Sequence, residues 1–246
     1  MVAPGAFPAR RPAVWVNCAA SLDGRLALAG GLRARFSSTE DLVRVQKLRA
    51  HADAILIGVG TVIKDDPSLR VHWELLGEPP GRNPTRVIVD ASGRTPENAR
   101  VLDGSAPTIL ATSERSHRTF PPTVHTIVVG KEKVDFGELF PLLYELGIRR
   151  LMVEGGAEIL SSVLRARLFD RFTIYYAPVV VGGATAPPVV SGLETHRPEE
   201  EIEMDLVGLE PMGEGFVATY VPRKISSTLP PAPSETGAVT PRSDKT

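Results

Sequence analysis

The stretch AILIGVGTVIKDDPSLRV, residues 54–71, decides the fold class of this chain. Its first four residues are apolar and mostly branched, which is typical of a strand that is buried on both faces. We expect the strand to stop at Gly58, followed by Gly60, Thr61 and a turn signal at residues 65–67. In an open α/β sheet, ligands bind outside the carboxyl ends of strands, where glycines let the backbone come close. The stretch therefore indicates a strand that leads into a ligand site, although an ordinary glycine-rich turn would look the same.

A second unit of this kind is LMVEGGAEILSSVL, residues 151–164. An apolar strand runs into Glu154, then into Gly155 and Gly156, and a helical pattern follows. A helix that begins after two glycines leaves N–H groups free to bind an anion, and the helix dipole adds to the attraction. The pattern is neither the GxGxxG fingerprint nor a Walker loop. Together the two units predict one cleft for a phosphate-bearing cofactor; two unrelated tight turns are the alternative.

Strands and helices alternate along the rest of the chain. We expect strands over residues 14–20, 54–57, 85–89, 108–111, 124–129, 151–153, 172–181, 206–210 and 216–221. We expect helices over residues 39–52, with Ser38 as the N-cap, over 136–146, and after Gly156. This order predicts a three-layer α/β/α fold with a mostly parallel sheet and an antiparallel C-terminal hairpin. The expected single domain spans residues 13–224, and the Pro-rich segments 1–12 and 225–246 are expected to be disordered.

Composition excludes several classes of function. The net charge of the 246 residues is −1, so a broad nucleic-acid-binding surface is not expected. The one cysteine, Cys18, rules out an intrachain disulfide and a Cys-rich zinc site. No apolar run approaches the roughly 18 residues of a membrane helix, and the residues before Arg10 lack the apolar core of a secretory signal. We therefore expect a cytoplasmic protein that binds neither nucleic acid nor membranes.

These motifs resemble the pyrimidine reductases of riboflavin biosynthesis, a family with a dihydrofolate-reductase-like fold. The matching pieces keep their order: SLDGR (21–25), RFSSTEDLVRVQKLRA (35–50), GVGTVIKDDPSLRVH (58–72), RVIVD (86–90), VEGG (153–156) and APVVVGG (177–183). The GVGT to DDPSL block is specific, whereas VEGG alone would be weak. The resemblance covers about residues 13–221. It is greatest to the stand-alone enzymes, because His72 ends the block where fused bacterial enzymes tend to carry Arg. One cysteine cannot supply the CxxC of their zinc deaminase domain, so a deaminase step is excluded.

The resemblance implies an NADPH-dependent reductase that needs no metal. Its substrate would be 2,5-diamino-6-ribosylaminopyrimidinone 5′-phosphate, a small phosphorylated pyrimidine, and its product the ribitylamino compound. The ribose must open to an imine, whose C1′ then receives hydride from C4 of the nicotinamide. The resemblance also implies a homodimer, with the apolar segment 172–181 as a candidate edge or interface strand.

The resemblance also assigns individual residues. The expected cofactor-binding residues are Ala19, Thr61, Asp65, Ala91, Ser92, Gly155, Gly156, Ala157, Glu158 and Ile159. The expected substrate-binding residues are Arg33, Arg49, Leu69, His72 and Glu154. Ala91 departs from the family, which often has Ser there, and Ser92 is the substitute; relatives also differ at Arg33. Hydroxyls near Arg94 and Arg115, at two strand ends, would suit the 2′-phosphate of NADPH, although most loop arginines are only solvated.

Arg49 and Glu154 carry the sharpest expectations. Arg49 falls where relatives hold the substrate phosphate, and a guanidinium offers a fork of donors suited to phosphate oxygens. A cation that only stabilises the helix end is the alternative. Glu154 is the catalytic candidate, because it would accept a hydrogen bond from the diaminopyrimidine or assist proton movement during ring opening. A surface glutamate would look the same.

Two other classes of function stay open. One is another pteridine-type NADPH reductase, such as a dihydrofolate reductase, since that fold serves both. The other is a catalytically silent nucleotide-binding protein.

Overall fold

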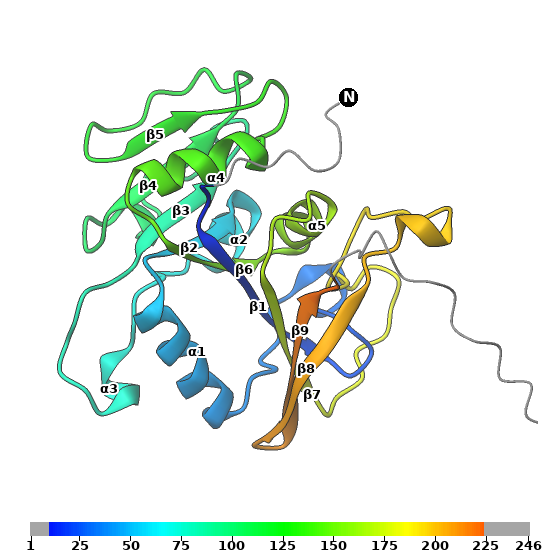
Figure 1. Ribbon diagram of the computed structural model, residues 1–246. Helices are drawn as coiled ribbons and strands as arrows, with labels where there is room; N and C mark the ends of the chain where they lie inside the picture. Colours follow the sequence, from blue (N-terminus) through cyan, green and yellow to red (C-terminus); the bar gives the residue numbers. More distant parts are fainter. Residues whose placement is uncertain (1–9, 224–246) are drawn as a thin grey trace, which may run out of the picture.

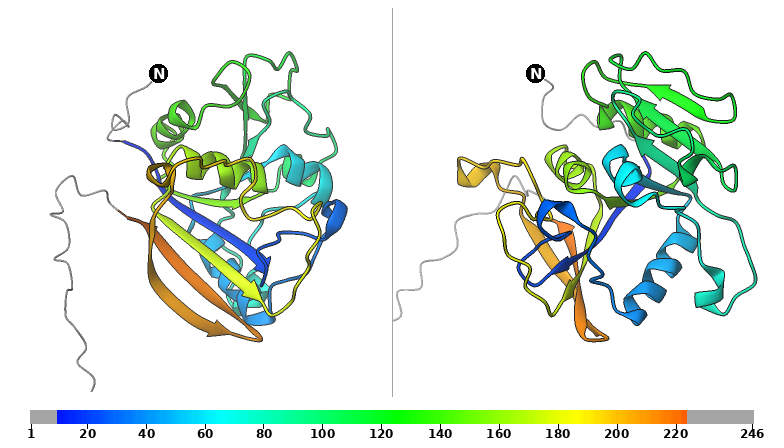
Figure 2. Two further views of the ribbon diagram at one scale, coloured as in Figure 1. Left: turned by 90° about the vertical axis from the view of Figure 1, so that its right-hand side faces the viewer. Right: turned by 180° about the vertical axis from the view of Figure 1, so that it is seen from behind.

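The computed structural model describes residues 10–223, and it builds them around one mixed sheet (Figure 1). The strands are β1 (Ala13–Ser21), β2 (Ala54–Gly58), β3 (Thr85–Val89), β4 (Thr108–Thr112), β5 (His125–Val128), β6 (Arg150–Gly155), β7 (Arg171–Ala177), β8 (Met204–Met212) and β9 (Gly215–Pro222). Their order across the sheet is β5-β4-β3-β2-β6-β1-β7-β9-β8. Pairs among β1 to β7 are parallel, and β9 is antiparallel to both β7 and β8. The predicted mostly parallel sheet with an antiparallel C-terminal hairpin, orange in Figure 2, is confirmed.

Helices cover both faces of the parallel part. They are α1 (Thr39–His51), α2 (Val59–Asp65), α3 (Trp73–Leu76), α4 (Phe136–Glu145) and α5 (Ala157–Arg165). Successive residues of β2 point to opposite faces: Leu56 packs in the same cluster as residues of α4 and α5. Ile55 and Ile57 pack with residues of α1 and α2. The strand is apolar throughout because it has no solvated face, and the predicted three layers are confirmed.

Local signals set the ends of α1. The hydroxyl of Ser38 accepts a hydrogen bond of 3.2 Å from the N–H of Asp41, so the predicted N-cap is confirmed. The helix ends at His51, and the extended Ala52 leads directly into β2. This places Arg49 in the last turn, beside the central strands.

The prediction for residues 172–181 needs two corrections. The strand predicted over residues 172–181 ends at Ala177, because the backbone of residues 179–182 bonds to the loop after β1 and not to a strand. It is also not an edge strand, since β7 lies between β1 and β9, and β8 forms that edge of the sheet. Residues 59–65, for which no helix was predicted, form the short helix α2, and the chain turns at Asp66, within the predicted turn at residues 65–67.

The predicted disorder of residues 1–12 and 225–246 falls almost wholly outside the described residues and stays a prediction. Within residues 10–223, no helix is both long and apolar enough to span a bilayer.

Candidate active site

The two glycine units come together at the carboxyl ends of the neighbouring strands β2 and β6. The hydroxyl oxygen of Thr61, on α2, accepts a hydrogen bond of 3.1 Å from the N–H of Gly156, the N-cap of α5. Gly58, at the end of β2, lies so close to α5 that an added Cβ would stand 2.8 Å from Cγ1 of Ile159. A side chain there would therefore push the two units apart. The structure thus brings the predicted cofactor residues of both units into one place.

The start of α5 offers free backbone donors. The carbonyl of Gly156 accepts from the N–H groups of Ile159 and Leu160. The N–H groups of Ala157 and Glu158, in the first turn, have no partner within the helix. Gly155 precedes them at φ +114°, a conformation that L side chains rarely adopt. An anion such as a pyrophosphate fits these donors and the positive end of the helix dipole.

Arg49 and Glu154 form a bidentate ion pair beside this glycine pair. Nε and Nη2 of Arg49 each donate to one oxygen of Glu154, both at 2.7 Å. The two side chains are 16% and 13% exposed. Burial works to lower the pKa of Arg49, but the charge and the hydrogen bonds of Glu154 outweigh it and raise that pKa. The candidate catalytic residue is therefore held by the residue that was expected to bind phosphate.

The segment that follows the turn at residues 65–67 (the DDP turn) is held against α1 by hydrogen bonds. Nη1 of Arg49 donates to the carbonyl of Arg70 at 3.1 Å, and the N–H of His72 donates to Oε1 of Gln46 at 2.9 Å. Leu69 has φ +52° and is only 2% exposed, because it packs in the same apolar cluster as Ile57. The imidazole of His72 is half exposed and contacts Glu74. These contacts place Leu69 and His72 within the same region as Arg49.

The loops after β3 and β4 are tied to each other. The buried carboxylate of Asp90 accepts from the N–H of Arg94 and from the N–H and hydroxyl of Thr95, at 2.7–2.9 Å. The hydroxyl of Ser113 donates to the carbonyl of Ala91 at 2.8 Å. Ala91 and Ser92 are partly exposed on this loop, and the side chains of Arg94 and Arg115 are exposed. The two arginines expected near a 2′-phosphate thus lie on loops that are joined.

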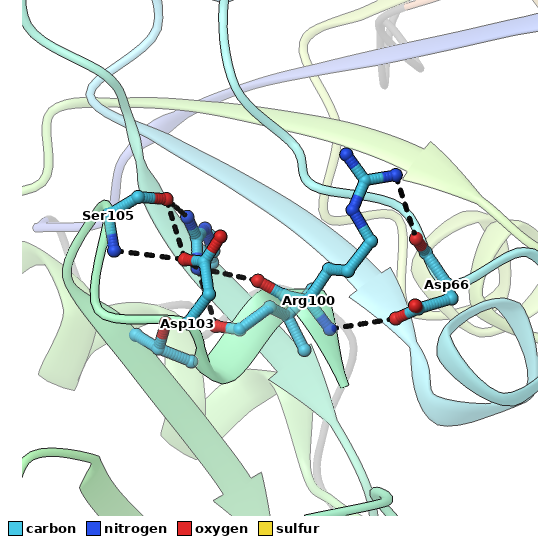
Figure 3. A network of polar contacts seen from close by, with 7 residues as sticks. Asp66, Arg100, Asp103 and Ser105 are labelled. Atoms are coloured by element: carbon cyan, nitrogen blue, oxygen red, sulfur yellow. Dashed lines mark hydrogen bonds and ion pairs between the residues drawn. The ribbon is translucent and has the colours of Figure 1, made fainter. Parts of the chain in front are cut away.

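Asp65 ends α2 and is exposed, whereas the next residue, Asp66, is held in place. Oδ1 of Asp66 accepts a hydrogen bond of 2.8 Å from the N–H of Arg100 (Figure 3). Asp66 has φ +39°, so the chain turns sharply there. This contact fixes the DDP turn to the loop between β3 and β4.

That loop is anchored in turn by Arg86, a fully buried arginine on β3. Its Nη1 donates to the carbonyls of Arg100 and Val101, at 3.1 and 2.7 Å, and to Asp103 at 2.9 Å; Nη2 bonds to Ser105. Figure 3 labels three of these partners, Arg100, Asp103 and Ser105. We did not predict a role for Arg86. The signal was a charged residue, Arg86, directly before the apolar run VIV at residues 87–89.

The remaining predicted residues lie on the far side of β6. Ala19 is half buried on β1 and packs with Tyr175, and Arg33 is exposed on the loop after β1. A residue that sequence reasoning missed, Asp23 of the SLDGR motif, accepts from the N–H groups of Val181 and Gly182 at 2.9 and 2.8 Å. The Val181 N–H first, and the Ser21 hydroxyl next, lower the pKa of Asp23 to about 2. Asp23 thereby joins the loops after β1 and β7.

The hollow in this structure lies away from the candidate site, and no metal-binding cluster is found among the described residues. A hollow of about 310 Å³ opens at the opposite edge of the sheet, where Asp53, Thr85 and Thr108 stand at strand starts, so it is separate from this site. In the part of the chain from residue 10 to 223, no cluster of His, Cys, Asp and Glu could hold a metal ion.

The fold and this geometry define an α/β domain with a candidate ligand site at the carboxyl edge of a parallel sheet. The chain belongs to the RibD C-terminal domain family, whose model matches residues 12–218. The family membership that the motifs predicted is confirmed.

Curated relatives share most of their length with this chain. It is 40% identical over 218 residues to the 2,5-diamino-6-ribosylamino-4(3H)-pyrimidinone 5′-phosphate reductase of Archaeoglobus fulgidus, covering 85% of this chain and 97% of that protein. The reductase of the same name from Methanothermobacter thermautotrophicus is 38% identical, with 85% and 98% covered. The Riboflavin biosynthesis protein RibD of Bacillus amyloliquefaciens is 30% identical, but only 58% of it is covered. The predicted likeness to stand-alone enzymes is confirmed.

Solved structures share the fold. The diaminohydroxyphosphoribosylaminopyrimidine deaminase/5-amino-6-(5-phosphoribosylamino)uracil reductase of Thermotoga maritima matches with a TM-score of 0.73 and 28% identity, over 87% of this chain and 57% of that one. The Riboflavin Biosynthesis Reductase Rib7 of Saccharomyces cerevisiae matches with a TM-score of 0.69 over 87% and 90% of the two chains. At 21% identity the yeast match speaks for the fold alone.

Proposed function

We propose that this protein is the NADPH-dependent reductase of riboflavin biosynthesis that converts the ribosyl side chain of 2,5-diamino-6-ribosylamino-4(3H)-pyrimidinone 5′-phosphate to ribityl. Relatives that carry this activity in their names match it along nearly their whole length. The structural observation that supports the proposal most is the hydrogen bond from Gly156 to Thr61, which unites two glycine units at one strand edge.

The cofactor side of the site would be built from backbone donors. The N–H groups of Ala157 and Glu158 would bind the pyrophosphate of NADPH, with Gly155 allowing close approach. Thr61 and Asp65 supply a hydroxyl and an exposed carboxylate that can bind ribose or amide groups. NADPH supplies the hydride when bound.

The preference for NADPH over NADH would come from the joined loops after β3 and β4. Ala91 and Ser92 border them, and Arg94 and Arg115 would bind the 2′-phosphate. Arg94→Ala and Arg115→Ala are each expected to reduce the ratio of kcat/KM for NADPH to that for NADH. Equal use of both cofactors by the wild-type enzyme would remove this assignment.

On the substrate side, Glu154 would accept hydrogen bonds from the diaminopyrimidine and assist proton movement as the ribose ring opens. Leu69 would border the pyrimidine, and Arg49, Arg33 and His72 are the candidates for the 5′-phosphate. These groups bind and orient the substrate, so that the C1′ carbon is held at the reacting position. Ala19 is a candidate cofactor contact.

Side-by-side turnover tests the proposal against its rivals. Purified protein with NADPH is offered the ribosylaminopyrimidine phosphate in one assay and dihydrofolate in another, and the absorbance of NADPH is followed. We expect NADPH to be oxidised in the assay with the ribosylaminopyrimidine phosphate and not in the assay with dihydrofolate. Oxidation with dihydrofolate alone would indicate another pteridine-type reductase, and NADPH binding without oxidation would indicate a silent nucleotide-binding protein.

A homodimer in the cytoplasm completes the proposal. The candidate interface strand is β8 and not β7, because β8 is the edge strand of the sheet. It carries Leu206, Val207 and Leu209, each more than half exposed. Apolar edge strands of this kind are usually covered. Light scattering at micromolar concentration is expected to give the mass of two chains for the wild type and of one for Leu209→Lys. A monomeric wild type would contradict the dimer.

A further inference from the structure

One arginine of the loop after β4, Arg118, bonds to the loop after β3. Nη1 of Arg118 donates to the carbonyls of Gly93 and Thr95, at 3.0 and 2.6 Å. These two carbonyls flank Arg94, so Arg118 fixes the backbone on both sides of that residue. The guanidinium also lies 4.9 Å from the centre of the Phe120 ring, and Phe120 is buried in the core. Arg118 therefore ties the segment that carries Arg94 to the body of the protein.

Gly93 is a point of close packing between the two loops. It has φ +73°, and an added Cβ would stand 2.7 Å from Oγ of Ser116 and 2.9 Å from Cβ of Arg118. The hydroxyl of Ser116 is buried and has no hydrogen-bond partner among residues 10–223, so packing places it against Gly93. A side chain at position 93 would push the loops apart without changing any charge.

The arginines that these loops carry are held only through their backbones. The N–H of Arg94 donates to Asp90 at 2.9 Å, and the N–H of Arg115 donates to the carbonyl of Lys131 at 3.2 Å. Both side chains are exposed, and neither guanidinium is paired within the described part of the chain. Two like charges on adjoining loops repel each other unless an anion lies between them. The bonds of Arg118 oppose a separation of the loops.

We propose that Arg118 is a positioning residue for the choice of cofactor. It holds the loop after β3 against the loop after β4, so that Arg94 and Arg115 bind the 2′-phosphate of NADPH together. Arg118 is not itself a phosphate ligand in this account, because both hydrogens of its Nη1 are used by carbonyls. This inference rests on the proposed function, whose cofactor preference it deepens.

The position of the loops predicts which kinetic constant changes. In the sheet, β2 lies between β3 and β6, so the loops after β3 and β4 are on the other side of β2 from Glu154. Loss of the bonds of Arg118 is therefore expected to raise the KM for NADPH and to leave kcat nearly unchanged. Binding and turnover of NADH, which has no 2′-phosphate, should stay close to the wild type.

The test measures the Kd of NADPH and of NADH by calorimetry, together with kcat and KM for both. Arg118→Met is expected to weaken the preference for NADPH by about fivefold or more. Gly93→Ala, which removes no charge, is expected to weaken it in the same direction. Arg118→Lys rescues only in part, since an ammonium lacks the planar fork of donors. The double variant Arg118→Met/Arg94→Ala loses little beyond Arg94→Ala alone, because Arg118 acts through Arg94.

The matched control is Arg171→Met, which removes an exposed charge at the start of β7 and is expected to leave the preference unchanged. Should Arg118→Met fail to fold, Arg118→Lys and Gly93→Ala carry the same comparison. An effect of Arg118→Met that adds fully to that of Arg94→Ala, with no effect of Gly93→Ala, would overturn the inference in favour of a direct phosphate ligand.

Two further results would also overturn the inference. Equal losses with NADPH and NADH, or a lower melting temperature with an unaltered preference, would show that Arg118 is purely structural. A wild type that binds both cofactors equally would leave no preference for Arg118 to support. Failure of the proposed function is distinct, because the wild type would then bind NADPH more tightly than NADH but reduce no ribosylaminopyrimidine phosphate.

Discussion

The hydroxyl of Thr61 accepts a hydrogen bond of 3.1 Å from the N–H of Gly156, across 95 positions of sequence. This bond joins α2, which follows β2, to the start of α5, which follows β6. Because β2 and β6 are parallel neighbours, their carboxyl ends meet at one edge, and the bond fixes how the two turns face each other. The free N–H groups at the start of α5 thereby keep a defined position beside Thr61.

Replacing Thr61 tests this relationship. Thr61→Val keeps the shape of the side chain but removes the acceptor, so the N–H of Gly156 loses its partner. A hydrogen bond of this kind contributes about 1 kcal/mol, which predicts roughly fivefold weaker NADPH binding. Thr61→Ser retains the hydroxyl and is expected to bind NADPH nearly as the wild type does. Calorimetric titration measures both; equal affinities for Thr61→Val and the wild type would show that the bond does not order the site.

The close approach of Gly58 to α5 predicts a specific steric cost. The Cβ of Gly58→Ala would stand 2.8 Å from Cγ1 of Ile159, so the helix or the strand must shift. We expect a loss of about 1–3 kcal/mol in the free energy of unfolding, measured by urea denaturation. Gly60→Ala is the matched control, since nothing lies within 4 Å of its added Cβ. The double variant Gly58→Ala/Ile159→Ala should lose less than the sum of the single changes; strict additivity would argue against the contact.

Removing the buried charge of Arg86 is expected to lower the stability of the folded protein. Arg86→Met leaves the carbonyls of Arg100 and Val101 and the carboxylate of Asp103 without their donor. Breaking a buried charged network by removing one partner costs about 3 kcal/mol. Arg171→Met, at the exposed start of β7, serves as the control and should change stability little. Equal denaturation midpoints for the two variants would mean that the network contributes nothing.

The lowered pKa of Asp23 predicts that the stability of the folded protein depends on pH. Its pKa in the folded protein is about 2, below the ordinary 3.8, mainly because the Val181 N–H and the Ser21 hydroxyl bond to the ionised form. Its contribution to stability is therefore present above about pH 4 and is lost as the pH falls from there toward 2. Asp23→Asn is expected to melt below the wild type at neutral pH, and the gap should narrow below about pH 4. A gap that stays constant over this range would exclude the linkage.

Patterns within one element predicted most of the fold. The apolar run before Gly58 and the cap at Ser38 were both predicted correctly. A strand that is buried on both faces is apolar along its length, and an N-cap requires a particular residue type, so both can be recognised from neighbouring residues alone. The apolar residues 179–181 misled the prediction, since a loop that bonds to Asp23 can be as apolar as a strand. Sequence alone does not fix which side chains meet across elements.

For that reason the candidate site was predicted as a set of residues but not as a set of contacts. The motifs indicated both Arg49 and Glu154, yet their pairing depends on how α1 packs beside β6. The bonds from Arg86 to the loop after β3 depend on tertiary packing in the same way. Such partners are chosen by geometry that only the assembled sheet provides.

The proposed function requires that this protein transfer hydride to the ribosyl carbon of a phosphorylated pyrimidine. The most direct measurement incubates it with NADPH deuterated at C4 of the nicotinamide and with 2,5-diamino-6-ribosylaminopyrimidinone 5′-phosphate, followed by mass spectrometry of the product. We predict a ribityl product that carries deuterium at C1′ when the label occupies the transferred position. Unreduced substrate with both C4-labelled forms of NADPH, or a reduced product that contains no deuterium from either form, would rule out this hydride transfer.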